Sequence, residues 1–370
     1  MIRLLIVSDC HLRKTIYTQG KKLEGDAEYA ISQIQNISKI AEPTAAIIAG
    51  DVFDRKTVNG EEIELANKLI SAIRNERNIP IFAIQGNHDI GEKNILEEIA
   101  GVKSIHDKIE TIENLTIGGL DWSHDTISRF REQNKDTAPA APPAPVADIL
   151  VLHESMRPFS NFGDVNKLSV DDMPVETLCV VGDTHLPEFI KKTTDNGVKY
   201  VISPGCIYPT DKTEFLRESA AVWLVDVDKI DNRLCVEAHK IPLNVRSALD
   251  FSDLSVDKIS DLLSNHPEDE ESLTPVIYIN RDDIKSVQTL PNSGFFILAP
   301  VRKNVAEDTE DGVTSLGMLN ASFEDRLAAA VNALVDDKDS VELLTKELVY
   351  LYNSERLNED LESMVEEKMK

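Results

Sequence analysis

Five short apolar runs in the first half of the chain each lead into Asp, Asn or His residues. These groups hold four of the eight histidines. They are Asp9-Cys10-His11, Asp51-Val52-Phe53-Asp54, Asn87-His88-Asp89, His153-Glu154 and Asp183-Thr184-His185. One such group would be an ordinary turn or helix cap. Five in succession are better explained by one site at the carboxyl edge of a sheet.

The spacing of the apolar runs predicts an α/β layered sheet. Stretches of helical period at 27–41 and 61–75 separate the first strand-like runs. Strands are expected at 3–8, 45–49, 79–84, 116–121, 149–152, 177–181, 200–203 and 221–227. Glycine precedes Asp51, Asn87 and Asp183. We expect these glycines to allow tight turns that direct short side chains into a shared cavity.

The pattern changes after about residue 240, and 370 residues exceed one ordinary compact core. We expect a first domain at 1–240, a small cap domain at 241–320 with strands at 274–280 and 294–301, and two helices within 321–370. The proline-rich segment 131–146 has no period and is expected to be a surface loop.

Composition limits where such a chain can work. No apolar run approaches the length that spans a membrane, and the first residues lack a cleavable leader pattern. Four cysteines lie far apart, which is typical of a reducing compartment. We therefore expect a cytoplasmic protein that does not bind membranes. The net charge is -26, and 26 acidic against 11 basic residues follow residue 250.

Taken together, the five groups resemble the calcineurin-like metallophosphoesterase pattern of Asp-x-His, Gly-Asp-x-x-Asp, Gly-Asn-His-Asp, a later His and a terminal Gly-His-x-His. The match spans residues 9 to 185. The resemblance implies a layered β-sandwich core flanked by helices, with a small α+β cap domain and C-terminal helices. It also implies phosphoester hydrolysis, in which two divalent ions activate a water molecule and hold the phosphate oxygens.

The resemblance also assigns ligands. It implies that one metal is held by Asp9, His11 and His185, that the other is held by Asn87, His153 and Asp183, and that Asp51 bridges both. Mixed imidazole and carboxylate ligands suit Mn²⁺, Fe or Zn²⁺ better than Mg²⁺, and the resemblance favours Mn²⁺. Asp183 stands where the family usually has His, and its harder oxygen shifts the preference toward Mn²⁺ or Mg²⁺.

Three further residues receive roles from the same resemblance. His88 is expected to face the scissile phosphate and to protonate the leaving oxygen or stabilise its charge. Asp54 and Asp89 are expected to fix imidazole orientation, although a simple turn role also suits Asp54. Cys10 lies between two ligands, but in strand-like geometry its side chain points away from them.

Within this family the chain resembles the SbcD branch of DNA repair nucleases. The supporting features are Gly50 to Arg55 followed by a helix, the Pro-Gly element within residues 202–209, and a cap domain before terminal helices. The resemblance implies DNA as substrate and an SbcC-like coiled-coil ATPase as partner, with a homodimer inside a heterotetramer. A phage version would work in the host cytoplasm.

Other interpretations stay open at this point. The same core serves phosphodiesterases and phosphatases that act on small nucleotides or phosphoproteins, and a non-catalytic scaffold can also keep the fold. The terminal helices can dock on an ATPase or pack on their own domain. The acidic tail is unfavourable for DNA binding, which depends on Lys and Arg. Basic pairs such as Arg13-Lys14 and Arg55-Lys56 near the motifs, or basic surface on a partner, would compensate.

Overall fold

The structure is a computed structural model that describes residues 1–74, 77–90, 95–98, 101–123, 146–157, 168–217, 220–264 and 273–301. One compact unit comprises residues 1–161 and 165–303. A second comprises 162–164 and 304–370 and lies outside the described residues. The expected loop at 131–146, apart from Val146, and the expected terminal helices also lie outside them.

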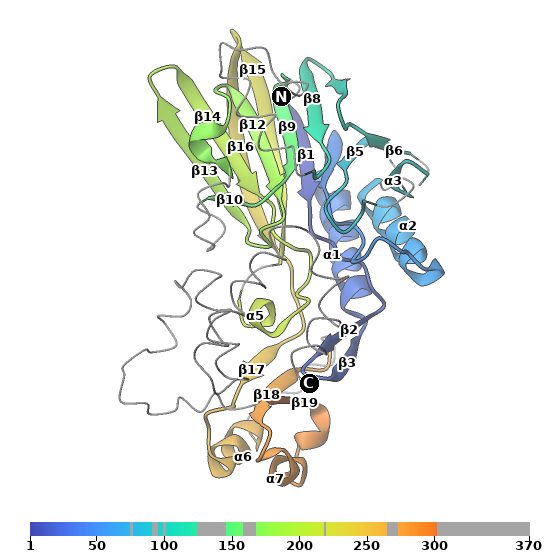
Figure 1. Cartoon of the computed structure of the whole chain (residues 1–370), viewed down its shortest axis with the longest axis vertical. Helices are drawn as coiled ribbons and strands as arrows, with labels where there is room; N and C mark the ends of the chain where they lie inside the picture. Colours follow the sequence, from blue (N-terminus) through green and yellow to red (C-terminus); the bar gives the residue numbers. More distant parts are fainter. Residues whose placement is uncertain are drawn as a thin grey trace, which may run out of the picture. The chain divides into compact units, whose positions relative to one another are not determined.

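Two six-stranded sheets dominate the first unit (Figure 1). In order, the first contains β16 (Arg233–Pro242), β15 (Ala221–Ile230), β1 (Ile2–Val7), β4 (Ala45–Ala49), β5 (Ile81–Ile84) and β6 (Val102–Ser104). The second contains β13 (Glu188–Thr194), β14 (Gly197–Ser203), β12 (Thr177–Gly182), β9 (Ile149–His153), β8 (Leu115–Leu120) and β7 (Ile109–Ile112). Strands β1, β4, β5 and β6 run parallel, as do β8, β9, β12 and β14. Antiparallel strands complete the edges.

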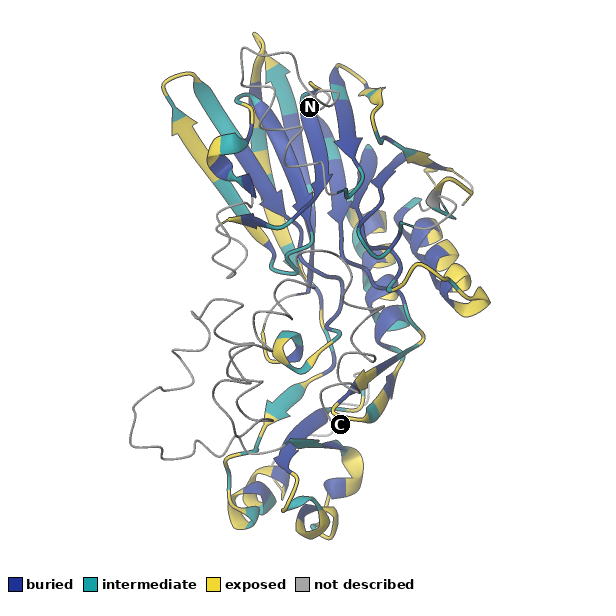
Figure 2. Cartoon of the chain, in the orientation of Figure 1, coloured by how far each residue is buried: buried dark blue, intermediate teal, exposed yellow. Residues whose placement is uncertain are grey.

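The inner faces of the two sheets share one buried apolar core. Ile6 and Ile47 of the first sheet belong to the same cluster as Val151 and Val180 of the second. Each of these side chains is fully buried, and burying one contributes roughly 1.5–3 kcal/mol. Figure 2 shows the central strands almost entirely buried. Burial on both faces explains why the parallel strands are continuous apolar runs.

Helices α1 (Asp26–Ala41) and α2 (Gly60–Arg74) cover the outer face of the first sheet. Their buried residues Ile34 and Leu69 join Val7 and Ile48 in a second cluster. The outer face of the second sheet packs against residues near β10 (Met156–Arg157), β11 (Leu168–Ser169) and the 3-10 helix η1 (Val170–Asp172). The two sheets therefore form the middle layers, with α1 and α2 outside the first sheet and β10, β11 and η1 outside the second.

A small parallel sheet follows the sandwich in the chain. It contains β17 (Ala248–Asp250), β18 (Val276–Asn280) and β19 (Ile297–Val301). Helices α6 (Val256–Ser264) and α7 (Ile284–Gln288) and the 3-10 helix η2 (Ser293–Phe295) connect these strands. The sheet and helices have an apolar cluster of their own.

Arg246 connects this small sheet to the sandwich. Its guanidinium is almost fully buried and donates to both carboxylate oxygens of Asp26, at 3.0 and 2.8 Å. It also donates to the carbonyls of Glu24 and Thr274. Asp26 begins α1, and Glu24 ends β3 (Lys21–Glu24), which pairs with β2 (Thr15–Thr18) in a hairpin. One side chain thus ties α1, the hairpin and the approach to β18 together.

The predicted fold class is confirmed, with a sandwich of two sheets flanked by helices. The expected strands and both long helices occur with small shifts at their ends. Sequence analysis missed the β2–β3 hairpin and the edge strands β13 and β16, whose many exposed residues give them little apolar character. Among the described residues, no helix is both long enough and apolar enough to cross a membrane.

Candidate metal centre

The expected site residues follow the carboxyl ends of five strands in the two sheets. Strands β1, β4 and β5 lead into the first three groups, and β9 and β12 of the second sheet lead into the last two. These five strands are parallel within their sheets. Their loops therefore meet at one edge of the sandwich.

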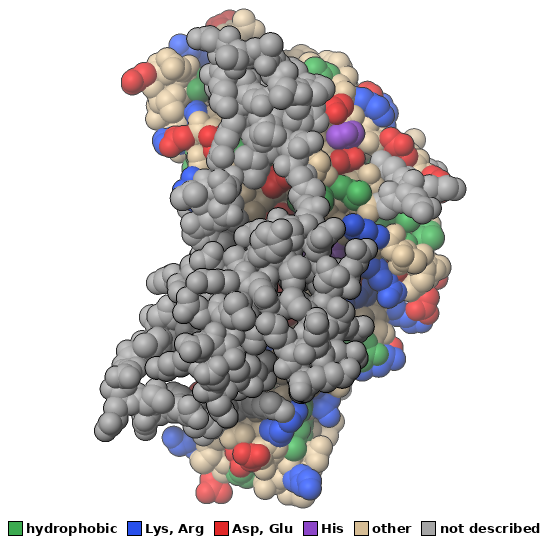
Figure 3. Space-filling view, in the orientation of Figure 1, with side chains coloured by type: hydrophobic (Ala, Val, Ile, Leu, Met, Phe, Trp, Pro, Cys, Tyr) green, Lys and Arg blue, Asp and Glu red, His purple; other side chains and the backbone are tan. Residues whose placement is uncertain are grey.

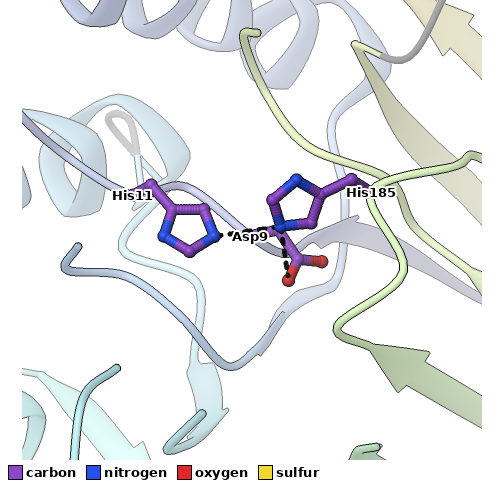
Figure 4. A group of neighbouring side chains, drawn as sticks. All are labelled: Asp9, His11 and His185. Carbon is purple, nitrogen blue, oxygen red and sulfur yellow. Dashed lines mark hydrogen bonds and ion pairs between the residues drawn. The ribbon is translucent and has the colours of Figure 1, made fainter. Parts of the chain in front are cut away.

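Asp9, His11 and His185 form one compact group, shown in Figure 4. The Nε2 atoms of His11 and His185 lie 3.0 Å apart, and the His185 Nε2 lies 3.7 Å from Asp9 Oδ1. Asp9 Oδ1 accepts the backbone N–H of Asp183 at 3.0 Å. Asp9 Oδ2 is buried and has no hydrogen-bond partner within the described part of the chain. Such an oxygen is costly to bury unless a cation or donor meets it.

Asp51, His153 and Asn87 form an adjoining group. The Nε2 of His153 lies 3.2 Å from Asp51 Oδ2 and 3.2 Å from Asn87 Oδ1. The Nδ1 of His153 donates to the Ala49 carbonyl at 2.8 Å, which directs Nε2 into the site. Asp51 Oδ2 also lies 3.7 Å from the Nε2 of His11. Asp51 therefore faces both groups, as a bridging ligand must.

The charges of the site favour a cation. Burial lowers the pKa of His11 to about 3. Burial also opposes protonation of His153 and His185, but hydrogen bonds and charges of Asp51 and Glu214 outweigh it and raise their pKa values to about 10 and about 9. Burial raises the pKa of Asp9 to about 6. Without metal, the protonated rings of His153 and His185 therefore balance the buried carboxylates, and divalent ions held by oxygen and imidazole nitrogen would take the place of these protons.

Five of the expected ligands have backbone conformations that L-residues rarely adopt. Asp9, His11, Asp51, Asp183 and His185 have φ values of 48°, 40°, 50°, 92° and 53°. Each such conformation costs on the order of 1–3 kcal/mol and persists only when neighbouring contacts impose it. Two of the imposing contacts are the hydrogen bond from the backbone of His11 to Asp51 and the one from the Tyr208 hydroxyl to the His11 carbonyl.

Glycines give the ligands room. Gly50 has a φ of 91°, and a Cβ there would lie 2.4 Å from His153 Nδ1. The expected tight turn is therefore present at Gly50. At Gly86 the φ is not left-handed, and the requirement is space instead, because a Cβ would lie 2.1 Å from Asp51 Oδ1.

His88 forms a third compact group with His11 and Asp51. Its ring lies edge-on to that of His11, with centroids 5.0 Å apart. The Nδ1 of His88 donates to the Asp54 carbonyl at 2.6 Å, and its backbone N–H donates to Asp51 Oδ1 at 2.9 Å. The side chain is half-buried, and the hydrogen bond to the Asp54 backbone sets the direction of its other ring nitrogen.

Asp54 orients an imidazole through its backbone, because its carbonyl accepts from His88 Nδ1, whereas Asp89 contacts no imidazole among the described residues. The carboxylate of Asp54 pairs with Arg13 and lies 3.6 Å from His11 Nδ1, beyond hydrogen-bonding distance. Asp89 is buried and accepts the backbone N–H groups of Val52, Phe53 and Gly86. It thus holds the loops that carry Asp51 and Asn87 rather than an imidazole. Burial and the charge of Asp51 raise the pKa of Asp89 to about 7.

Asp183 contributes a backbone hydrogen bond and a nearby charge to the site. Its N–H holds Asp9 Oδ1, whereas its carboxylate is absent from the compact ligand groups found among the described residues. It is still near enough for its charge to raise the pKa values of His153 and His185. Cys10 is buried with its sulfur 3.8 Å from the Ser8 carbonyl and is likewise absent from those groups.

Sequence reasoning missed Glu214, which lies in the short helix α5 (Lys212–Phe215). Glu214 Oε1 accepts a hydrogen bond from the Nδ1 of His185. Glu214 Oε2 accepts from the backbone N–H of Thr210 at 2.7 Å and from its hydroxyl at 3.0 Å. The sequence around Glu214 gives no sign of this contact, because Glu214 and His185 are 29 positions apart and come together only through the turn that follows β14.

Comparison with known proteins agrees with this geometry. The family model for calcineurin-like phosphoesterases matches residues 2–203, more than half of the chain. The chain therefore belongs to the calcineurin-like phosphoesterase family, whose members bind two divalent metal ions.

Curated relatives are similar at low identity. The SbcD component of nuclease SbcCD from Staphylococcus saprophyticus is 30% identical over 92 residues, which is 25% of this chain and 24% of that protein. DNA double-strand break repair protein Mre11 of Archaeoglobus fulgidus is 25% identical over 238 residues, which is 58% of this chain and 51% of that protein. The chain thus spans a quarter to a half of their length. The solved structure of TT1561 from Thermus thermophilus has a TM-score of 0.36 at 13% identity, covering 65% of this chain and 98% of that one.

Proposed function

We propose that this chain is a two-metal phosphodiesterase that hydrolyses DNA as the nuclease subunit of an SbcCD-like complex. The observation that carries the metal chemistry is Asp51, which lies within 3.7 Å of His11 and 3.2 Å of His153 and so joins two ligand groups. The DNA substrate is supported by the relatives, which are named as a nuclease subunit and a DNA repair protein.

In this proposal Asp9, His11 and His185 hold one ion, and Asn87, His153 and Asp183 hold the other. Imidazole nitrogens mixed with carboxylate and amide oxygens suit Mn²⁺, which we propose as the natural ion. When bound, such ions supply positive charge to phosphate oxygens and activate water for in-line attack.

The protein's own part is to keep donors and protons in place. Ala49 and Asp54 hold the Nδ1 protons of His153 and His88 through their backbone carbonyls. With the Nδ1 proton held by the Asp54 carbonyl, a second proton on the His88 ring is carried by Nε2. That imidazolium can give its Nε2 proton to the leaving oxygen or donate it in a hydrogen bond to a phosphate oxygen. Asp89 keeps the Asp51 and Asn87 loops fixed without touching the substrate.

Basic side chains beside the site offer a surface for a polyanion. Figure 3 shows Lys and Arg atoms gathered between the regions where Figure 1 places α2 and the β2–β3 hairpin. Arg13, Lys14 and Arg55 belong to the loops in this part of the chain. Arg55 is more than half exposed, and its guanidinium donates to the buried Glu62 at 2.7 Å. Local basic surface of this kind attracts phosphates even on an acidic protein.

The direct test is hydrolysis of end-labelled duplex DNA by the purified chain in Mn²⁺, with a chromogenic phosphodiester assayed in parallel and His88→Ala as the inactive control. We expect degradation of the DNA that His88→Ala abolishes. Cleavage of the small ester alone, even with an SbcC-like ATPase added, would assign the chain to the phosphodiesterases of small nucleotides. Mn²⁺ content near zero would support a non-catalytic scaffold.

The partner part of the proposal has a separate test. Residues 321–370 are proposed to dock on the ATPase, within a complex that contains two copies of each subunit. A chain ending at residue 320 should then cleave the chromogenic ester at the rate of the full chain and fail to co-purify with the ATPase. Retained binding to the ATPase would contradict docking through this segment.

A further inference from the structure

We propose that Glu214 is a positioning residue that orients His185 as a metal ligand and strengthens it as a donor. This inference rests on the proposed two-metal function. It concerns a residue outside the family motifs, on the segment between β14 and β15.

Glu214 and the expected metal ligands contact opposite nitrogens of the His185 ring. Its Nδ1 donates to Glu214, and its Nε2 faces Asp9 and His11. Within the described structure, Glu214 is the hydrogen-bond partner found for this Nδ1. The ring is 24% exposed, more than the rings of His11 and His153, so packing restrains it less. A hydrogen bond at Nδ1 fixes both the ring orientation and the tautomer that leaves the Nε2 lone pair free.

Glu214 is itself held in place. Its second oxygen accepts two hydrogen bonds from Thr210. Asp211 caps α5 by accepting the N–H groups of Thr213 at 2.6 Å and Glu214 at 3.0 Å. These hydrogen bonds restrain the Glu214 carboxylate beside His185, and the Glu214 side chain is only 15% exposed.

The other imidazoles of the site are arranged differently. Backbone carbonyls of Ala49 and Asp54 accept from the Nδ1 atoms of His153 and His88, and the Nδ1 of His11 is without a partner among the described residues. A carbonyl is neutral, whereas a carboxylate carries charge and makes the imidazole a stronger donor. The metal shared by His11 and His185 therefore depends on Glu214 far more than the other metal does.

The test measures Mn²⁺ binding by isothermal titration calorimetry, without any DNA. We compare Glu214→Gln and Glu214→Ala with Asp211→Ala, which removes the cap of α5 but leaves the Glu214 carboxylate in place. Removing such a partner typically weakens metal binding by about 10- to 100-fold. We expect that loss at one of two Mn²⁺ sites for Glu214→Ala and a smaller loss for Glu214→Gln, whose amide oxygen still accepts from Nδ1. Asp211→Ala should bind like wild type.

His11→Ala separates this inference from the proposed function. If His11→Ala weakens Mn²⁺ binding and both Glu214 variants bind like wild type, Glu214 has no positioning role although the metal site stands. If His11→Ala also binds like wild type, the metal assignment itself is wrong. Should Glu214→Ala lose its circular dichroism spectrum, the isosteric Glu214→Gln is the deciding variant. An equal loss of Mn²⁺ binding in Asp211→Ala would mean that the effect comes from unravelling of α5.

Discussion

The Nε2 atoms of His11 and His185 face each other at 3.0 Å although the two residues are 174 positions apart in the chain. One residue follows the first strand of one sheet, and the other follows a strand of the second sheet. Burial keeps the pKa of His11 at about 3, so its nitrogen is a lone-pair donor near neutral pH. The pKa of His185 is about 9, so without metal its ring is protonated and faces the lone pair of His11. A cation that displaced this proton would be held by both imidazoles and would link the two sheets.

Removing metal should therefore lower thermal stability. A ligand at 100 times its Kd adds about 2.7 kcal/mol to the native state, which for a protein of this size corresponds to roughly 3–4 °C in Tm. Thermal melts in EDTA and in Mn²⁺ should differ by about that amount. His11→Ala should show a smaller difference between the two buffers than the wild type, because it removes a ligand of one of the two ions. An equal response of the variant and the wild type would contradict a cross-link at His11.

Asp51→Ala should lose both metal binding and hydrolysis, because Asp51 contacts the ligands of both groups. We expect Mn²⁺ content to fall below one ion per chain, as measured by mass spectrometry of the purified, dialysed protein. Two ions per chain in this variant would show that Asp51 is not the shared ligand.

His88→Ala should keep its metal and lose hydrolysis, because the His88 ring is held by the Asp54 carbonyl and is not needed as a ligand. General acid catalysis typically contributes 10²- to 10⁴-fold, so kcat on the chromogenic ester should fall by about that factor at unchanged Mn²⁺ content. Metal loss equal to that of Asp51→Ala would instead make His88 a ligand, as its place in the third compact group allows.

Asp183→His restores the residue type that the family usually has at this position. Imidazole is softer than carboxylate and favours Zn²⁺ relative to Mn²⁺. Competition between the two ions should shift toward Zn²⁺ in the variant, as measured by metal content after incubation in an equimolar mixture. An unchanged ratio would show that the Asp183 side chain does not bind metal and that its backbone N–H is its only contribution.

Arg246→Ala should destabilise the protein by about 3–5 kcal/mol, because it leaves the buried carboxylate of Asp26 without its partner. Replacing both, with Arg246→Met and Asp26→Leu, removes the unpaired charge and should recover most of that loss. Urea unfolding of the three proteins measures this. A double variant as unstable as the single one would mean that the pair is not coupled.

Much of the site could be predicted because strand ends are visible in the sequence. The apolar runs before Asp9, Asp51 and His153 are buried on both faces, and their parallel pairing makes their ends converge. The hydrogen-bond partner of each carboxylate could not be predicted from the sequence. Asp89 binds backbone N–H groups rather than an imidazole, and Glu214 reaches His185 only through the turn that follows β14. Such contacts depend on loop conformation, which no period in the sequence encodes.

The pairing of β1 with β15 also determines when the site can form during synthesis. Strand β1 is made first, yet its antiparallel neighbour comprises residues 221–230. The carboxylate that holds the last expected ligand is residue 214. A ribosome must therefore complete nearly the whole sandwich before the first strand has both its neighbours. A nascent chain that already carries every expected ligand still lacks the second neighbour of the strand that leads into Asp9 and His11, so we expect the hydrolytic site to assemble only late in synthesis.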